Sequence, residues 1–255
     1  MGKILTKEKE IVVPGQCLAE GLDSVPGMGT YREGDYIFAA RLGLVSLEGR
    51  TIKLIPLAGR YLPKRNDVII ARVTDVTFSS WRMDVNSAYS AMLSLKDATN
   101  EFIPKGADLT HFYNFNDYVV TKVVNVTPQY LIDLTMKAPG LHKLPEGRIM
   151  EVSPVKVPRI IGKRGSMVSM IKNATNCQII VGQNGWIWLQ GRDPAKELLA
   201  YETIRKIDAE AHTSGLTEHI RAFLEEKTGA PVVVPQEEYG ERAFDEGERW
   251  STQND

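Results

Sequence analysis

The sequence predicts a multidomain chain that contains a small all-β module, a five-stranded β-barrel, an α+β domain and a disordered acidic tail. Three observations support this fold class. Two long blocks of short apolar segments and turns come first, an apolar helical period follows a glycine-rich loop at residues 162–165, and acidic residues crowd the end of the chain. A length of 255 residues has room for one to three domains, and 43% hydrophobic residues are enough for their cores.

Residues 1–61 are expected to form the small all-β module. No helical period appears there, and turn-rich stretches such as Val12-Val13-Pro14-Gly15 separate short apolar runs. Strands are expected at 36–40, 42–46 and 51–56. A module of this size has little core of its own, so we expect it to pack on a neighbour or a partner.

Residues 62–140 are expected to form the barrel. Alternating apolar and polar residues predict five strands, with a looser segment between the third and the fourth, at 67–76, 81–86, 90–95, 117–126 and 130–137. Five strands with a long connection between the third and the fourth suit an OB-type barrel.

Residues 147–211 are expected to form the α+β domain. The sequence predicts a strand at 155–157, a short helix from Pro158, a longer helix from Ser166, a strand at 177–181 and a returning strand at 186–189. Asn184-Gly185 is a strong hairpin signal between those last two strands. Asp193 and Pro194 then begin a helix that runs to about residue 211, with an inward face of Leu198, Tyr201, Ile204 and Ile207.

The loop Gly162-Lys163-Arg164-Gly165 is the leading candidate site. Its glycines allow a tight turn and a close approach to a ligand, and the following helix begins with unpaired N–H groups that favour an anion. Lys163 and Arg164 add two full charges, so the loop is expected to hold a sugar-phosphate backbone. Arg159 and Ser166 lie beside it, and bases would lie across an apolar groove of Ile160, Ile161, Val168 and Ile180. The alternative is a glycine-rich corner between helices with solvated basic side chains.

The barrel sequence offers further candidates. Lys64, Arg65, Arg72 and Arg82 could guide a phosphate backbone, although each could equally be a solvated charge. Trp81 and Tyr89 are candidates for stacking on bases, and the alternative is that both are ordinary barrel aromatics.

The charge distribution separates the folded part from the tail. Residues 231–255 hold seven acidic residues against two arginines, a balance of −5, so the remaining chain balances to +4 because the whole chain is −1. A helix is expected at 212–229, and residues 230–255 are expected to be a mobile acidic tail. A second interpretation is that the tail competes with RNA for basic surface.

Several function classes find no support in the sequence. Cys17 and Cys177 match no zinc or disulfide spacing, which suits a reducing cytoplasm, and no apolar run is long enough to span a membrane. The four histidines show no metal-ligand spacing, and no nucleophile or phosphate-transfer motif appears. We therefore expect no catalytic residue, no metal, no cofactor and no membrane contact.

Two modules resemble known RNA-binding families. The order β-α-α-β-β-α with the Gly162–Gly165 loop resembles a type I KH domain over residues 147–211, and such loops hold about four nucleotides. Asp67-Val68, Ala71-Arg72-Val73-Thr74 and Asp133-Leu134-Thr135-Met136-Lys137 resemble the opening and the close of an S-one repeat. The aromatics in Thr77-Phe78-Ser79-Ser80-Trp81-Arg82 are displaced by one position from that family's pattern.

The order of the modules resembles the archaeal exosome cap subunit of the ribosomal-RNA-processing protein four type. Stretches such as 29–35, 55–61 and 159–167 are similar to that family. The resemblance implies a non-catalytic protein that captures single-stranded RNA for degradation or processing. It also implies three copies seated on a hexameric phosphorolytic ring. The alternatives are an antitermination-type RNA-binding factor, which usually has a second KH module, and an assembly scaffold that binds no RNA.

Overall fold

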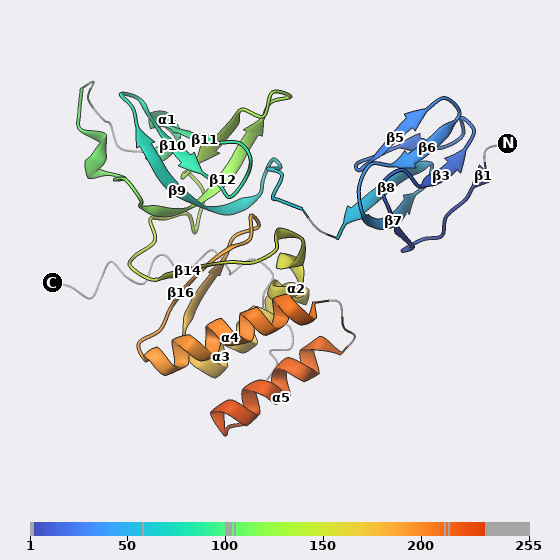
Figure 1. The fold of residues 1–255 in the computed structure, drawn as a ribbon. Helices are drawn as coiled ribbons and strands as arrows, with labels where there is room; N and C mark the ends of the chain where they lie inside the picture. The colour runs from blue at the N-terminus through green and yellow to red at the C-terminus, as the bar shows by residue number, and fades with distance from the viewer. Residues whose placement is uncertain are drawn as a thin grey trace. The chain divides into compact units, whose positions relative to one another are not determined.

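The computed structural model describes residues 3–57, 59–99, 104, 106–211, 213 and 215–232. The chain divides into two compact units, Met1–Gly59 and Arg60–Asp255 (Figure 1). The predicted fold class is confirmed: β-sheets come first, a closed five-stranded barrel follows, and an α+β domain comes last. Most of the predicted acidic tail, from residue 233 onward, lies outside the described residues.

The first unit consists of two small sheets around one core. The strands are paired in the orders β1-β3-β6-β5 and β2-β7-β8-β4. Side chains from both sheets, including Leu18, Ile37, Val45 and Leu54, form the core. The strands are β1 (Lys3–Ile4), β2 (Ile11–Val12), β3 (Cys17–Glu20), β4 (Val25–Pro26), β5 (Thr30–Glu33), β6 (Tyr36–Ala39), β7 (Gly43–Glu48) and β8 (Thr51–Pro56).

The second unit begins with the closed barrel, whose strand order is β10-β11-β13-β12-β9. The parallel pairing of β11 with β13 closes it. A short helix α1 (Leu95–Ala98) and a 3-10 turn η1 (Leu109–His111) lie in the connection between the third and fourth strands. The strands are β9 (Val68–Val76), β10 (Ser80–Asp84), β11 (Ala91–Ser94), β12 (Tyr118–Val126) and β13 (Ile132–Thr135).

The prediction that Trp81 stacks on bases is wrong. Side chains on a strand alternate between its two faces, so Trp81 and Met83 share the inward face while Arg82 lies outward. Trp81 is completely buried, its indole Nε1 donates to the Tyr113 carbonyl at 3.0 Å, and its ring meets the Tyr113 ring edge-on. Trp81 is therefore a core residue of the barrel.

The α+β domain has a three-stranded sheet with helices on one face. The sheet order is β14-β16-β15, and Figure 1 shows α2, α3 and α4 beside the sheet. The elements are β14 (Arg148–Glu151), η2 (Pro154–Lys156), α2 (Val157–Ile161), η3 (Lys163–Gly165), α3 (Ser166–Thr175), β15 (Gln178–Val181), β16 (Trp186–Gln190), α4 (Pro194–Glu210) and α5 (Leu216–Thr228).

Two expectations about this domain are wrong in detail. The first strand is Arg148–Glu151, and residues 155–157 belong to the helical segment that follows. Pro154 and Pro158 explain the difference, because proline has a φ suited to the first helical turn and donates nothing to a strand ladder. Leu198 is 51% exposed, since the buried face of α4 is set by Ala200, Thr203, Ile204 and Ile207.

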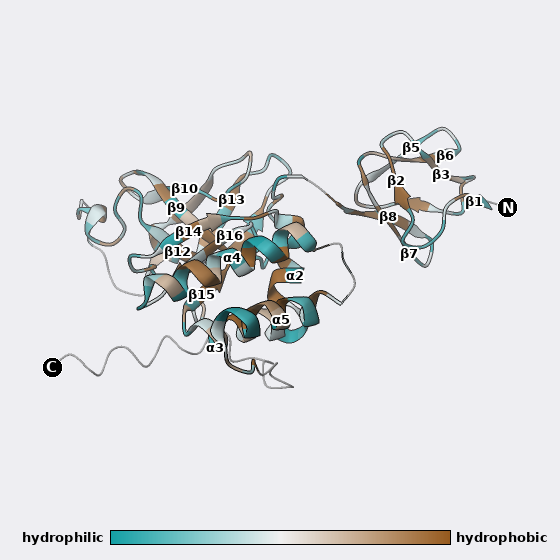
Figure 2. Cartoon of the chain, turned by 60° about the horizontal axis from the view of Figure 1, so that its bottom comes forward, coloured by the Kyte–Doolittle hydropathy of each residue, from teal (hydrophilic) through white to brown (hydrophobic). Residues whose placement is uncertain are grey.

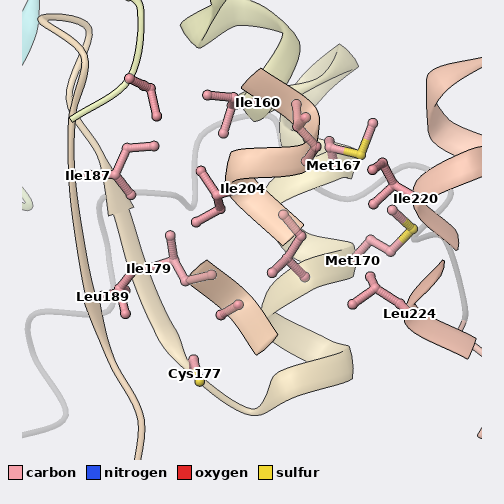
Figure 3. Close-up of a cluster of buried hydrophobic side chains, with 14 of the residues drawn as sticks. Ile160, Met167, Met170, Cys177, Ile179, Ile187, Leu189, Ile204, Ile220 and Leu224 are labelled. Carbon is pink, nitrogen blue, oxygen red and sulfur yellow. The ribbon is translucent and has the colours of Figure 1, made fainter. Parts of the chain in front are cut away.

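The helices pack over an apolar core that reaches from the sheet to α5. Figure 3 shows Met167 and Met170 of α3 facing Ile220 and Leu224 of α5. All four belong to one buried cluster with sheet residues such as Ile187. Helix α3 is thus held from two sides directly after the Gly162–Gly165 loop, so the core fixes where that loop lies.

The turn between β15 and β16 attaches the α+β domain to the barrel. Asn184 is completely buried. Its side-chain amide donates to the carbonyls of Ile70 at 2.7 Å and Val85 at 3.0 Å, and its Oδ1 accepts from the Ile70 N–H at 3.4 Å. Asn86 of the barrel donates in turn to the Asn184 carbonyl at 3.0 Å.

The same junction continues with Gln183 and with apolar side chains. Gln183 pairs with the backbone of Val68 twice, through its own N–H at 3.0 Å and through its Oε1 at 2.8 Å. Trp186 and Trp188, on the sheet face opposite the helices, join Ile70 and Val120 in a separate buried cluster. The barrel and the α+β domain therefore share a polar and apolar interface and form one unit.

We expect Asn184→Ala to loosen this interface. The substitution leaves buried backbone groups of the barrel without partners, and each such group costs on the order of 1–3 kcal/mol. The free energy of unfolding, measured by urea denaturation, should fall by about 2–4 kcal/mol.

Asn173→Ala is the matched control, because Asn173 is exposed on α3. It should change the free energy of unfolding by less than about 0.5 kcal/mol. Equal effects of the two substitutions would contradict the role given to Asn184.

Candidate nucleic-acid interface

The loop between α2 and α3 has an unusual backbone. Gly162, Arg164 and Gly165 all have positive φ angles, at 76°, 53° and 79°. A Cβ on Gly162 would lie 2.6 Å from the Met167 Cβ and 2.7 Å from the Met167 N. Glycine at position 162 is therefore required both by φ and by space, because α3 passes directly against it.

The charges of this loop face solvent. Lys163 and Arg164 are exposed, as is Arg159 one turn earlier. Among the described residues, no ion pair involves any of these three side chains. Three uncompensated cations thus lie within six residues of one another.

Helix α3 begins in the middle of this positive surface. Its N-cap is Gly165, and no side chain caps the first turn. The Ser166 N–H donates to the Lys163 carbonyl, and the dipole of the ten-residue helix favours a negative charge at its first turn. Ser166 at the first helical position is partly buried and adds a hydroxyl beside the loop.

The predicted apolar groove needs correction. Ile160 is completely buried in the domain core, because Val157 and Ile160 share the inward face of the short α2. Ile180 packs against the cluster between the sheet and the barrel. Ile161 and Val168 are partly buried beside the loop and Ile180 is partly buried as well, so burial excludes only Ile160 from that groove.

The four basic candidates of the barrel differ from one another. Lys64 and Arg65 are exposed on the turn before β9, and Arg82 is exposed on β10. Arg72 is half-buried and forms an ion pair with Asp84 at 3.1 Å. Arg72 therefore stabilises the pairing of β9 with β10, and the other three cations remain accessible.

Sequence reasoning missed several exposed apolar residues on the barrel, among them Phe78 and Met92. Phe78 is fully exposed at the β9–β10 turn, which closes through the Thr77 N–H and the Ser80 carbonyl at 2.9 Å. Met92 of β11 is 50% exposed and lies across from Arg82. In OB folds, the face of the second and third strands and the first loop bind oligonucleotides. The sequence did carry a signal for Phe78. This aromatic residue lies between Thr77 and Ser79, in the short connection between two expected strands, where a side chain is usually exposed.

The described residues contain no group of three or more His, Cys, Asp or Glu side chains that could hold a metal ion. In the same part of the chain, no helix is long and apolar enough to cross a membrane. Burial and a hydrogen bond to Asp67 raise the pKa of the Tyr61 hydroxyl, and burial raises that of Tyr113. Tyr61 belongs to the barrel core and Tyr113 packs against it.

Three family descriptions match successive parts of the chain. Residues 9–58 match the N-terminal domain of the exosome RNA-binding protein RRP4, residues 60–104 match the RRP4 S1 domain, and residues 147–195 match a KH domain. The fold and these matches define a protein with an S1-type barrel, which is the S-one repeat, and a KH domain. Both are RNA-binding modules.

Relatives with a similar sequence extend over most of the chain. The exosome complex component Rrp4 of Pyrococcus abyssi is 45% identical over 88% of this chain and 85% of its own length. The Rrp4 of Methanothermobacter thermautotrophicus is 42% identical over 92% of this chain and 74% of its own. A crystal structure described as an exosome complex RNA-binding protein is 37% identical, with a TM-score of 0.60 over 66% of this chain and 97% of its own. The chain belongs to the archaeal Rrp4 family of exosome components.

We expect Gly162→Ala to be more damaging than an ordinary glycine substitution. The new methyl group would meet Met167, and the residue would also be strained at positive φ. The free energy of unfolding should fall by about 2–4 kcal/mol, as measured by thermal or urea denaturation.

Gly215→Ala is the matched control. Gly215 has a similar φ of 72°, and a Cβ there would meet nothing within 4 Å. Its loss should be about 1 kcal/mol, the cost of the backbone conformation alone. Equal losses would show that the contact with Met167 contributes nothing.

Proposed function

We propose that this chain is a non-catalytic cap subunit that captures single-stranded RNA and guides it into a phosphorolytic 3′–5′ exoribonuclease ring. The observation that carries the proposal is the loop Gly162–Gly165. It combines solvent-facing Lys163 and Arg164 with the uncapped start of α3. Cations and N–H groups bind phosphate oxygens in any sequence, so this contact gives affinity without selecting bases.

The barrel supplies a second RNA contact in this proposal. Arg82 and Met92 lie side by side on the outer face of β10 and β11, and Phe78 projects from the preceding turn. A cation, an apolar side chain and an exposed ring are the components with which OB folds hold the backbone and the bases of a single strand. Because the Asn184 junction joins the barrel to the KH domain, both contacts belong to one unit.

The N-terminal unit supports attachment to the ring. Ile11 of β2, Leu44 of β7 and Ile55 of β8 pair in one row across the second sheet. Ile11 and Ile55 are 61% and 50% exposed, and Figure 2 shows β2 and β8 coloured as hydrophobic. An apolar row of this kind on a small domain is typical of a protein interface. Three copies of the chain, each docked through this row, would cover a hexameric ring.

The antitermination-type alternative has less support. Residues 9–58 match the N-terminal domain of the exosome RNA-binding protein RRP4, which favours the exosome component over an antitermination factor. The scaffold alternative predicts a degraded phosphate loop, whereas Gly162, Lys163, Arg164 and Gly165 are all present.

We expect the double variant Lys163→Asp/Arg164→Asp to bind RNA weakly. Charge reversal places two carboxylates where phosphates should lie, so affinity for a single strand should fall ten- to a hundred-fold, which is about 1.4–2.8 kcal/mol. The slope of log K against log salt should fall by about 1.4, since each single-strand phosphate contact contributes roughly 0.7. Fluorescence anisotropy with labelled RNA at several salt concentrations measures both quantities.

Arg192→Asp/Lys196→Asp provides the control. Both residues are exposed in the same domain, and the change in net charge is identical. The control should keep most of the affinity of the wild type. If both double variants bind equally well, the loop does not hold the phosphates.

We expect Ile11→Lys/Ile55→Lys to abolish attachment to the ring and to keep RNA binding. Both side chains already face solvent, so the first unit should remain folded by circular dichroism. Size-exclusion chromatography with the ring subunits measures comigration, and Leu22→Lys, at an exposed position in another part of the unit, is the control. Comigration of the double variant with the ring would reject this docking surface.

A further inference from the structure

Two tyrosines on the barrel surface form a flat stack. The rings of Tyr89 and Tyr130 are 4.2 Å apart at their centres, and their planes differ by 5°. Tyr89 lies in the connection from β10 to β11, and Tyr130 lies in the connection from β12 to β13. Neither belongs to the buried core of the barrel.

The strand register places the two rings together. Strands β11 and β13 are parallel, with Ala91 paired to Ile132. Tyr89 and Tyr130 each lie two residues before that pair, so they occupy matching positions just beyond the end of the parallel strands. The stack is therefore anchored by the closure of the barrel.

Tyr130 holds a backbone conformation that is costly for an aromatic residue. Its φ is +59°, and among the described residues it is the only aromatic with a positive φ. The Tyr130 N–H donates to the Thr127 carbonyl at 2.8 Å, and the Thr127 N–H donates to the Leu131 carbonyl at 3.0 Å. This is a hairpin loop in which the position of Tyr130 favours glycine or asparagine. A bulky residue persists in such a conformation when its surroundings hold it there, and such positions cluster at ligand contacts.

The stack is accessible to a ligand. Tyr89 is 36% exposed and Tyr130 is 38% exposed. Among the described residues, no hydrogen bond ends on either hydroxyl. Trp81 and Tyr113 form a different kind of aromatic pair. Their rings meet edge-on at the barrel core, and the Trp81 indole has a hydrogen-bond partner. One aromatic pair therefore fills the barrel, and the other presents its surface to solvent.

We propose that Tyr89 and Tyr130 form a stacking site for an RNA base on the barrel. This proposal rests on the proposed function, and it adds a base contact to the phosphate contact of the Gly162–Gly165 loop. A nucleobase is the flat, apolar-faced ligand that extends a coplanar aromatic stack, and every base has such a face. The site would hold any unpaired base and would exclude paired ones, whose faces are covered by their neighbours.

The first experiment replaces the rings in the full-length chain. Tyr89→Leu/Tyr130→Leu should reduce affinity for a single strand about ten-fold, since stacking on one or two bases contributes about that much or more. Tyr89→Phe/Tyr130→Phe keeps both rings and should bind like the wild type. The salt slope should stay unchanged in both variants because no phosphate contact is lost.

The second experiment maps the contact in the unmodified protein. RNA that contains 4-thiouridine is crosslinked by long-wavelength light, and the attached peptides are identified by mass spectrometry. Peptides that contain Tyr89 or Tyr130 should carry the crosslink, and duplex RNA of the same sequence should give none there. This measurement tests the site even if the leucine variant folds poorly.

The outcomes distinguish this proposal from the broader one. If the folded leucine variant binds like the wild type, or if no crosslink reaches either peptide, the stack is a structural feature of the barrel or a contact for a protein. In that case, Lys163→Asp/Arg164→Asp should still weaken binding, and the phosphate loop keeps its role. If the wild-type chain binds no RNA at all, the proposed function itself fails.

Discussion

The buried amide of Asn184 is the interaction on which the arrangement of the second unit depends. One short turn of the KH domain packs against the barrel and pairs with backbone groups of Ile70 and Val85. Space around the turn is limiting, because a Cβ on Gly182 would lie 2.8 Å from the Ile70 N and one on Gly185 would lie 2.4 Å from the Val152 carbonyl oxygen. Leaving such buried polar groups unpaired costs free energy, so separating the barrel from the KH domain is unfavourable. The barrel and the KH domain thus meet RNA as one body.

The phosphate loop is fixed by the same principle at a smaller scale. Gly162 lies against Met167, and Met167 belongs to the core that joins the sheet, α3 and α5. The N–H groups at the start of α3 therefore point in a direction that is set by packing. A preorganised loop loses little conformational entropy when a phosphate binds. The exposed Lys163 and Arg164 are the adaptable part, since long side chains can follow an irregular backbone.

Much of this fold could be predicted from the sequence, and the errors have local causes. Strand alternation located the five barrel strands, and the Gly-x-x-Gly loop with the apolar period after it located α3. Prolines at 154 and 158 turned an apparent strand into a helical segment. Residue type alone made Trp81 and Ile160 candidates for contact with RNA. The structure shows that both side chains face inward, because it determines which residues of β10 and α2 point toward the core. The role of Asn184 could not be predicted at all, because its partners are more than ninety residues away in the sequence. The hairpin signal of Asn184-Gly185 predicts the turn, but it does not predict that the turn contacts the barrel.

The exposed surfaces of the Gly162–Gly165 loop and of the barrel share one property. In the proposed function the cations of the loop contact phosphates, and the exposed rings of Phe78, Tyr89 and Tyr130 offer flat faces. Neither kind of contact reads hydrogen-bond edges, so neither distinguishes one base from another. Each contact is weak by itself, and its effect grows when several act on one strand, because the first contact raises the effective concentration of the strand at the next. A rigid barrel–KH unit suits this mechanism, since the distance between its contacts does not change. If three such units form the proposed cap, a strand released by one would remain within reach of the others. Capture would then depend on whether the RNA is single-stranded, and its sequence would matter little.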